Sequence, residues 1–348
     1  MLPDIFSSTE TLRTAFEKGL DRQLDEEGLG TFILVLANAL FEEALFRKLE
    51  TRLQQRFTEI RHNYAEQLRH GRALTEAPDD VLVFLKLVAM RFRHLQTTDY
   101  RLNGDWELQF NQVRSLRPKR MSGEVVTHLS VPFSPSGFHF NKPFLDKEIL
   151  WSGDMYGMAV KLLYNKFPFV PIHGLLVPEP ARNHVQMLNV RMHRMFWELT
   201  DDAGQHIPGI GFAYNGFGAG ASINHLHLQM FVRQTRLPVM HPRWTHNGGN
   251  EDYPADCIVF DDQEEAWRYV ANLHHANITY NLVYLPGKIV CLPRRYQGNF
   301  KLPDWCENFA WYEMSGGMTT YDADDYNNLN EAEIISALAS TRSQRLPG

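Results

Sequence analysis

The most constraining feature of this sequence is a small-residue loop that runs directly into a segment of alternating polar and apolar residues. The loop extends from Asn215 to Ser222, and the segment behind it carries His225, His227 and Gln229. Alternate side chains of a β-strand project from one face, so a strand here aims two imidazoles and a carboxamide in one direction. The loop glycines let backbone N–H groups approach an anion closely. This pattern predicts an anion cradle beside nitrogen nucleophiles, which suits phosphoryl or nucleotidyl transfer.

Two other interpretations of the segment remain open from the residues alone. A His-x-His pair on a strand also suits zinc, although no further Cys, His, Asp or Glu follows closely and Gln229 is a poor ligand. A polar strand face packed against a glycine-rich turn needs no ligand at all. Anion chemistry accounts for the loop and the strand together, so we carry that hypothesis forward.

Composition restricts the compartment and the class of partner. With 35 Lys or Arg against 41 Asp or Glu, the 348-residue chain has a formal net charge of −6. A general nucleic-acid binder needs a basic face, so we expect no nucleic-acid partner. The three cysteines are too widely spaced for a disulfide framework, which favours a reducing, cytoplasmic compartment. We also expect no signal peptide and no membrane span, because the longest apolar run, from Phe32 to Ala37, is short.

The first hundred residues differ in pattern from the rest. An apolar stripe at spacings of three and four predicts a helix that carries Leu45, Leu49, Leu53, Phe57, Ile60 and Tyr64. A second helix is predicted from Asp79 to Met90, because Pro78 and two aspartates mark its start. This helical region serves either as a partner-binding or dimer surface, or as a layer that covers a sheet.

From about Asp105 onward, alternating segments predict short strands. They are 106–110, 125–131, 175–177, the histidine segment, 282–285 and 289–292. Helical periodicity is present at 181–199 and 263–277, and the tail from 322 combines a polar, turn-rich run with one short helix, 331–338. Antiparallel strands with interposed helices indicate an α+β fold.

Four regions of the chain, each with two or more matching segments, resemble the transferase branch of the histidine triad superfamily, and in particular the GDP-L-galactose and GDP-D-glucose phosphorylases. The histidine motif matches them through Tyr214–Asn215 and Ile223–His227. In the hydrolase branch a third histidine replaces Gln229. The stretch Leu163–Pro168 is more similar to the diadenosine tetraphosphate phosphorylases. The remaining matches are Leu108–Arg114, Arg117–Arg120, Phe138–Lys142, Pro171–Pro178, Tyr280–Val283, Val290–Pro293 and Trp311–Met318.

The resemblance implies a histidine-triad-like fold of two related halves, built mostly from antiparallel sheet with helices. We expect an N-terminal helical region at 1–100 and a catalytic half at 101–240, which carries His-x-His-x-Gln. A second half with the tail follows at 241–348; it lacks the histidine motif and is expected to act as a scaffold. Many relatives dimerise, so a homodimer is an expectation by analogy.

The implied activity is phosphorolysis of a nucleoside-diphosphate sugar, with a GDP-hexose as the best candidate, through a nucleotidyl-histidine. By resemblance His227 is the nucleophile, Gln229 donates to a phosphoryl oxygen, and His225 orients its neighbours. The partners are then a nucleotide and inorganic phosphate or a sugar phosphate. Two alternatives remain. One is a dinucleoside polyphosphate phosphorylase or ADP/ATP adenylyltransferase, and the other is a nucleotide-binding protein without turnover.

Further residues are candidates for holding the substrate. Asn215, Gly218 and Ser222 are expected at phosphate oxygens. Asn165 either contacts ribose or phosphate or caps a turn, and His173 is either a structural or a site residue. A basic cluster and a later Asn-Lys pair either clamp phosphates or lie in solvated loops: Arg114, Arg117, Lys119, Arg120, Asn141 and Lys142. No cofactor or metal is expected to be tightly bound, and Mg²⁺ would accompany the substrate.

Overall fold

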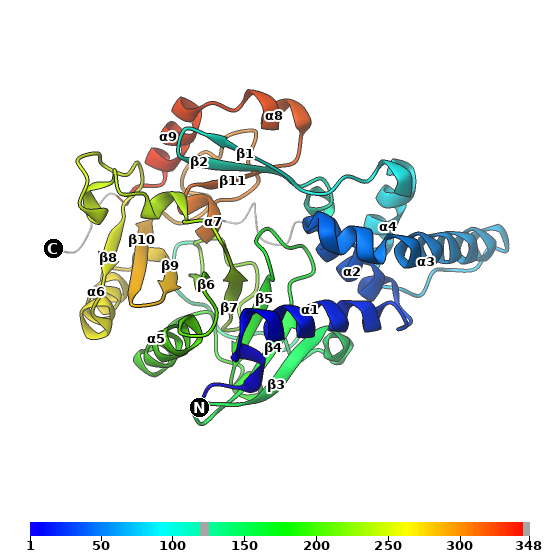
Figure 1. Ribbon diagram of the computed structural model, residues 1–348, viewed down its shortest axis with the longest axis horizontal. Coiled ribbons are helices and arrows are strands. Elements are labelled where there is room, and N and C mark those ends of the chain that lie inside the picture. The colour runs from blue at the N-terminus through cyan, green and yellow to red at the C-terminus, as the bar shows by residue number, and fades with distance from the viewer. Residues whose placement is uncertain (119–124, 344–348) are drawn as a thin grey trace.

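The computed structural model describes residues 1–118 and 125–343. Its centre is an eight-stranded sheet in the order β3-β4-β5-β7-β6-β9-β10-β8, antiparallel at every pairing (Figure 1). The strands are β3 (Ile149–Met155), β4 (Met158–Tyr164), β5 (Gly174–Pro178), β6 (Ile210–Asn215), β7 (Leu228–Val232), β8 (Ile258–Phe260), β9 (Thr279–Leu285) and β10 (Lys288–Arg294). Together with the helices around it, this sheet confirms the predicted α+β fold.

A second sheet of three strands has the order β1-β2-β11. Strands β1 (Asp99–Asn103) and β2 (Trp106–Phe110) form a hairpin, and β11 (Gly317–Thr320) pairs with β2 in parallel. The C-terminal part of the chain is therefore joined by main-chain hydrogen bonds to residues that precede the large sheet.

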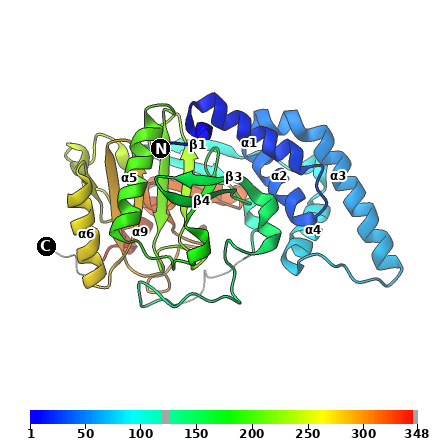
Figure 2. The ribbon, with the colours of Figure 1, turned by 90° about the horizontal axis from the view of Figure 1, so that it is seen from below.

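Different layers cover the two faces of the large sheet. Helices α1 (Thr9–Gln23), α5 (Val190–Gly204) and α6 (Gln263–His275) pack on one face (Figures 1 and 2). The opposite face of β6, β9 and β10 shares a hydrophobic core with the three-stranded sheet and the short helix α7 (Trp311–Met314). This second layer leaves part of the same face, over β4, β5 and β7, available for a pocket.

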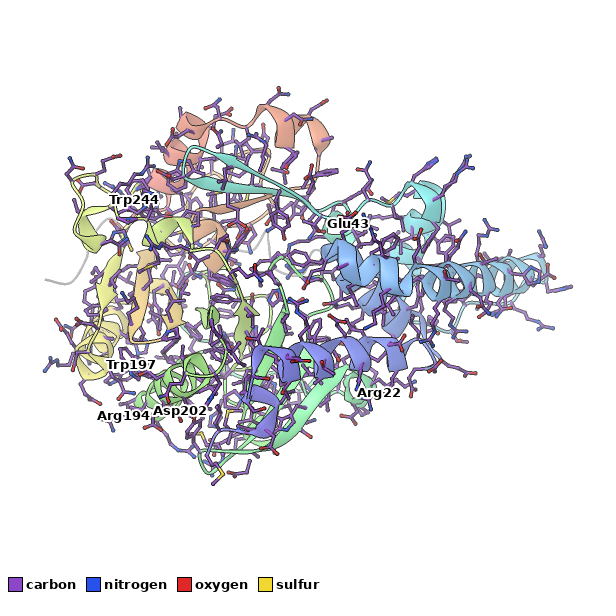
Figure 3. The ribbon with its side chains drawn as sticks, in the orientation of Figure 1. Arg22, Glu43, Arg194, Trp197, Asp202 and Trp244 are labelled. Carbon is purple, nitrogen blue, oxygen red and sulfur yellow. The ribbon has the colours of Figure 1, made fainter. Side chains whose placement is uncertain are left out.

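The N-terminal helices extend the first core sideways from the sheet. They are α1, α2 (Leu29–Phe41), α3 (Glu43–Arg69) and α4 (Pro78–Met90). All six predicted stripe residues lie on α3, and five of them are buried. Every residue of α2 except Gly30 is buried, because α1, α3 and α4 surround the helix. The far end of α3 projects away from the molecule with its side chains in solvent (Figure 3).

Capping residues set where several helices begin. The side chains of Ser8, Asn189 and Asp262 accept backbone N–H bonds at the starts of α1, α5 and α6. Helix α9 (Glu331–Ser340) begins with a capping box formed by Asn330 and Glu333. Because Asn189 caps α5, the helix predicted from residue 181 begins only at 190.

Three other predictions about elements are wrong. Residues 125–131 form no strand. The polar run expected at 322–330 contains the helix α8 (Ala323–Asn328), which Asp322 caps. Strand β7 begins at Leu228, so His225 and His227 precede the strand rather than lie in it. No described helix has the length and apolar character that crossing a membrane requires.

Candidate active site

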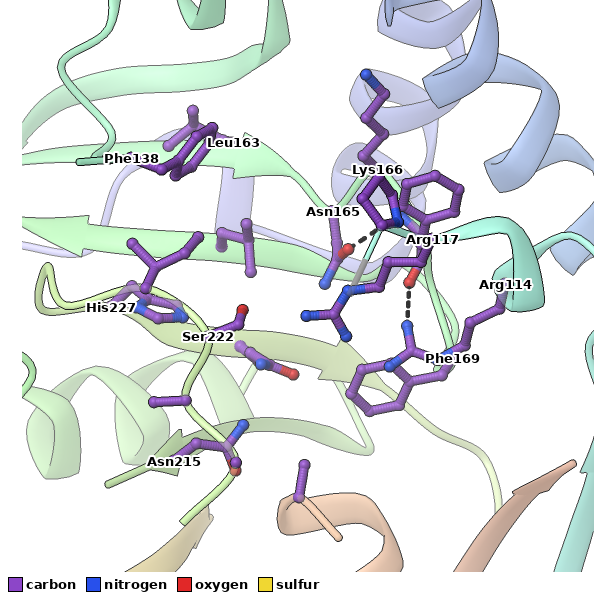
Figure 4. A pocket seen from close by; sticks show the side chains of 18 of the residues that line it. Arg114, Arg117, Phe138, Leu163, Asn165, Lys166, Phe169, Asn215, Ser222 and His227 are labelled. Atoms are coloured by element: carbon purple, nitrogen blue, oxygen red, sulfur yellow. Dashed lines mark hydrogen bonds between the residues drawn. The ribbon is translucent and has the colours of Figure 1, made fainter. Parts of the chain in front are cut away.

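A pocket of about 330 Å³ lies on the open part of the sheet, between β4, β5, β7 and the glycine loop (Figure 4). Several residues singled out in the sequence line it although they are far apart along the chain. They are Arg114, Arg117, Asn165, Asn215, Ser222, His227 and Gln229. The sheet register explains part of this convergence, because Leu175 on β5 and Ala213 on β6 are the direct neighbours of Gln229 on β7.

Hydrogen bonds fix the orientation of the His227 ring. Its Nδ1 lies 2.8 Å from the carbonyl oxygen of His225 and 3.0 Å from Oε1 of Gln186. Both partners are acceptors, so Nδ1 carries the proton of the neutral ring. The Nε2 atom then carries a lone pair, and no described residue forms a hydrogen bond with it. This is the tautomer that a nucleophilic imidazole requires.

Burial keeps the His227 ring neutral. The residue is 5% exposed. Burial lowers its pKa to about 4, and the carbonyl of His225 opposes this effect only in part. At neutral pH the ring is therefore uncharged, with its single proton on Nδ1.

His225 occupies a different place from the one that a regular strand would give it. It is fully buried and does not line the pocket. The rings of Phe133 and Phe140 lie against it, and the Phe140 N–H donates to its Nδ1 at 3.1 Å. Burial lowers its pKa to about 4. The structure thus places His225 behind His227, which it contacts through its own carbonyl group.

Gln229 faces the pocket with its amide nitrogen. Its Oε1 accepts from the indole N–H of Trp311 at 2.8 Å and lies 3.2 Å from Nε2 of His173. Because the indole nitrogen is only a donor, the carboxamide oxygen must face it. The amide N–H groups then remain for an anion. His173, which is fully buried outside the pocket lining, supports this arrangement.

Asn215 presents a second amide nitrogen, which points into the pocket in Figure 4. Its Oδ1 accepts from Nδ2 of Asn281 at 2.7 Å and from the backbone N–H of Trp311 at 2.8 Å. Both holding groups come from the second half of the chain. That half therefore positions donors and lines the pocket in addition to forming a scaffold.

The glycine loop approaches the pocket with only part of its length. Gly220, Ala221, Ser222 and Ile223 line the pocket, whereas Gly218 does not. The backbone N–H of Gly220 already donates to Oε1 of Gln297. Gly218 has φ +79°, and a Cβ there would lie 2.4 Å from the ring of Tyr296. The structure thus places Gly218 against the second half of the chain, where its conformation and the close contact require glycine.

Basic residues gather at the end of the pocket beyond Asn165. The buried Arg114 lies 4.2 Å from the ring centre of Phe169 and donates to the carbonyl of Phe167. Arg117 lies nearby and points into the pocket (Figure 4). Lys166, which the sequence analysis did not select, also lines the pocket and pairs with Asp80 of α4 at 2.6 Å. Lys119 and Arg120 lie outside the described residues.

The other candidate residues divide between the pocket and its surroundings. Asn165 lines the pocket, and its Oδ1 also accepts from the Phe167 N–H as a turn cap does. Asn141 instead donates to the carbonyl of Pro180, and the Lys142 ammonium group donates to that of Pro135. The structure thus places both Asn141 and Lys142 outside the pocket.

The described part of the chain contains no cluster of side chains that could bind a metal ion. Within residues 1–118 and 125–343, no three His, Cys, Asp or Glu side chains gather as a metal ion would require. Mg²⁺ that arrives with a substrate remains a prediction.

The sequence of this chain matches a known family. Residues 89–231 match the family model described as "GDPGP1-like, N-terminal domain". GDP-D-glucose phosphorylase 1 of Homo sapiens is 32% identical over 300 residues, which cover 75% of this chain and 76% of that protein. The protein of the same name from Macaca fascicularis is 32% identical over 165 residues, which cover 45% of this chain and 42% of the relative.

The fold has a relative among solved structures. The crystal structure of a yeast Ap4A phosphorylase superposes with a TM-score of 0.52 at 18% sequence identity, and covers 79% of this chain and 98% of that one. This likeness concerns the fold. The chain belongs to the GDP-D-glucose phosphorylase family, as its motifs indicated.

Proposed function

We propose that this chain is a GDP-hexose phosphorylase that works through a covalent nucleotidyl-His227. The names of the relatives support the substrate class. The arrangement of His227 supports the chemistry: a buried, neutral ring whose Nδ1 proton is held by two acceptors and whose Nε2 is left for attack. Among the described residues, His227 is the only histidine that lines the pocket.

The reaction proceeds in two displacements. The Nε2 lone pair forms a bond to the α-phosphorus while the bond to the bridging oxygen breaks, so hexose 1-phosphate leaves with the electron pair. The ring becomes an imidazolium with its proton still on Nδ1. Inorganic phosphate then attacks the same phosphorus, the N–P bond breaks, and its electron pair returns to Nε2. The products are GDP and hexose 1-phosphate.

Gln229 and Asn215 stabilise the negative charge that develops on the phosphoryl oxygens. Each has its carboxamide oxygen fixed by donors behind the pocket, so each directs N–H groups inward. Neither carboxamide can donate a proton to a leaving group. A sugar phosphate is already acidic enough to leave without one, which favours transfer over hydrolysis of a poor leaving group.

The pocket has an apolar end and a basic end, and these indicate how the substrate lies. Phe138, Leu163 and Ile223 line one end beside His227 and suit a nucleobase (Figure 4). Arg114 and Arg117 line the other end and suit the hexose phosphate or the incoming inorganic phosphate. A GDP-hexose in this orientation places its α-phosphorus near His227 and Gln229.

Intact-protein mass spectrometry without added phosphate tests the proposal. The donors are GDP-glucose, GDP-mannose, UDP-glucose, ADP-glucose and diadenosine tetraphosphate, each incubated separately with the protein. We expect the GDP sugars to add the mass of one guanosine monophosphate, and we expect phosphate to remove it. His227→Ala should abolish the adduct. The matched control is His184→Ala, because His184 pairs with Glu179 outside the pocket.

Three outcomes would contradict the proposal. If His227→Ala retains full turnover, the covalent mechanism is wrong. If the only adduct is adenylate from diadenosine tetraphosphate, the substrate is a dinucleoside polyphosphate instead. A protein that binds GDP-hexoses without any adduct or turnover would be a nucleotide-binding protein.

A further inference from the structure

Gln186 lies behind His227 in the segment that precedes α5. Its side chain forms hydrogen bonds with His227 and with Asn215, the first residue of the glycine loop. The residue is 1% exposed. Its Oε1 accepts from the backbone N–H of His227 at 2.9 Å and lies 3.0 Å from Nδ1 of the same ring. Its Nε2 donates to the carbonyl oxygens of Asn215 at 2.8 Å and His227 at 3.1 Å.

The chemistry of these partners fixes which way the carboxamide of Gln186 points. A backbone N–H can only donate, so it requires the oxygen, and the two carbonyl groups can only accept, so they require the nitrogen. A flipped amide would lose all of these bonds at a fully buried position, which is costly. The backbone of Gln186 is held as well, because its N–H donates to Asn224 and its carbonyl accepts from the Tyr214 hydroxyl.

We propose that Gln186 is a positioning residue for nucleotidyl transfer, which holds His227 in register with Asn215 and supplies the second acceptor oxygen at the Nδ1 proton. This inference rests on the proposed function. When Nε2 bonds to phosphorus, the ring becomes a cation whose only N–H is on Nδ1. Two carbonyl dipoles, from His225 and Gln186, face that proton and stabilise the charge.

The pKa of His227 responds to burial and to the carbonyl of His225, and no charged side chain of the described residues is among its causes. The charged residues that line the same pocket are Asp79, Asp80, Arg114, Arg117, Glu148, Lys166, Glu307 and Glu313. Two other imidazoles lie near the ring: His225, whose carbonyl touches Nδ1, and His173, which lies behind Gln229. Burial lowers the pKa of both rings, so both are neutral. The stabilisation of the cationic ring therefore depends on neutral dipoles, and a charge introduced at Gln186 should have a measurable effect.

Two substitutions with opposite expected effects on the stability of the cationic His227 ring test the inference. Gln186→Met keeps the length of the side chain but removes the acceptor, and we expect nucleotidylation of His227 to slow by about 10- to 100-fold, with the KM for GDP-glucose little changed. Gln186→Glu places a carboxylate against Nδ1. We expect it to raise the pKa of His227 by about 1–3 units and to lengthen the lifetime of the nucleotidyl-histidine.

A third variant separates this role from simple loss of packing. Tyr284→Phe removes a buried hydroxyl that lies 3.0 Å from Nδ1 of His193 in the core between the sheet and α5, while the side chains of Gln186 and His227 and their partners stay intact. We expect lower stability in this variant, with an unchanged pKa of His227 and an unchanged nucleotidylation rate. Thermal unfolding of all three variants reports the folding cost directly.

Two readouts distinguish the inference from the proposed function. Nitrogen NMR of labelled histidine measures the tautomer and the pKa of His227 without any substrate, and single-turnover mass spectrometry measures adduct formation. The inference is overturned if the ring carries its proton on Nε2, if folded Gln186→Glu leaves the pKa of His227 in place, or if folded Gln186→Met reacts at the wild-type rate. If the NMR results are as expected but the wild type forms no adduct, the proposed function fails and the role in transfer fails with it.

Discussion

At the scale of single residues, hydrogen-bond partners behind the pocket determine which end of each carboxamide faces into it. Trp311 is the clearest example, because its indole N–H fixes Gln229 while its backbone N–H fixes Asn215. One residue of the second half thus fixes the carboxamide oxygens of two pocket residues, which leaves their amide nitrogens for the pocket. Such prepared donors gain strength in a buried site because they need not reorganise during the reaction.

The contribution of Gln229 can be measured by removing its amide. We expect Gln229→Leu to lower kcat by about 10²–10³-fold, because one donor to the charged transition state is lost. Trp311→Phe should have a smaller effect, since it removes only the group that fixes the carboxamide. Steady-state kinetics with GDP-glucose measures both variants. Equal losses in the two variants would indicate that Gln229 acts through the packing of Trp311 and makes no contact with the substrate.

Much of the pocket could be predicted from local spacing, and the rest could not. His227, Gln229, Asn215 and Ser222 are marked by the loop and the alternation behind it. Gln186 carries no local signal, because its partner Asn215 is 29 positions away in the sequence. Trp311 is 82 positions from Gln229. Contacts of this kind depend on how the strands associate, which spacing along the chain does not encode.

At the scale of elements, alternation predicted strands correctly only where a neighbouring strand supplies hydrogen bonds. Residues 106–110 alternate and pair on both sides with β1 and β11. In the histidine segment the Leu226 N–H donates to the carbonyl of His184, in a loop rather than in a strand. A hydrogen bond to a loop therefore holds this segment, and the strand hydrogen bonds of β7 begin only at Leu228. The alternation in the histidine segment therefore predicted that His227 and Gln229 belong to the site, although His227 lies in a loop and not in a strand.

The docking of α1 on the sheet also belongs to this scale, and it depends on one glycine. A Cβ on Gly19 would lie 1.9 Å from the hydroxyl oxygen of Tyr164, which donates to the carbonyl of Phe16 at 2.9 Å. We expect Gly19→Ala to lower the free energy of unfolding by about 1–3 kcal/mol, because an added methyl overfills this contact. Urea unfolding followed by fluorescence measures the change.

Tyr164→Phe provides the matched test of that contact. It removes the hydroxyl that the new methyl would strike, so Gly19→Ala should cost less in the Tyr164→Phe background than alone. Strictly additive effects of the two substitutions would show that α1 does not pack on β4 in this way. The double-mutant comparison therefore tests whether the N-terminal helices form a fixed layer on the sheet.

At the scale of the whole molecule, one row of directly opposed residues crosses the large sheet from β3 to β8, and Gln229 is its only polar member. The row consists of Ile149, Leu163, Leu175, Gln229, Ala213, Val283, Val290 and Val259. Both predicted halves contribute to it. The second core covers one end of the row, at Ala213, Val283 and Val290, and the other end forms the floor of the pocket. The sequence could not indicate this division, because it depends on the parallel pairing of β11 with β2.

The stability of the molecule should fall in mild acid, because three neutral histidines are buried around the pocket. Burial lowers the pKa of His225 and His227 to about 4, and that of His173 well below its usual value. In the unfolded chain each has a pKa of about 6.5. Between these values the unfolded chain binds more protons than the folded one, so stability is complete above about pH 6.5 and is lost as the pH falls toward 4. Thermal unfolding between pH 8 and pH 4.5 measures the loss.

One substitution isolates the share of a single ring in this loss. His225→Phe places an apolar ring among Phe133 and Phe140 and removes one titrating group. Linkage gives a loss of about 2 kcal/mol at pH 5 for a histidine whose pKa falls from about 6.5 to about 4. Relative to the wild type, the variant should therefore gain stability by an amount of this order on going from pH 7.5 to pH 5. An unchanged difference between the two proteins across that range would mean that His225 has the same pKa in the folded protein as in the unfolded chain.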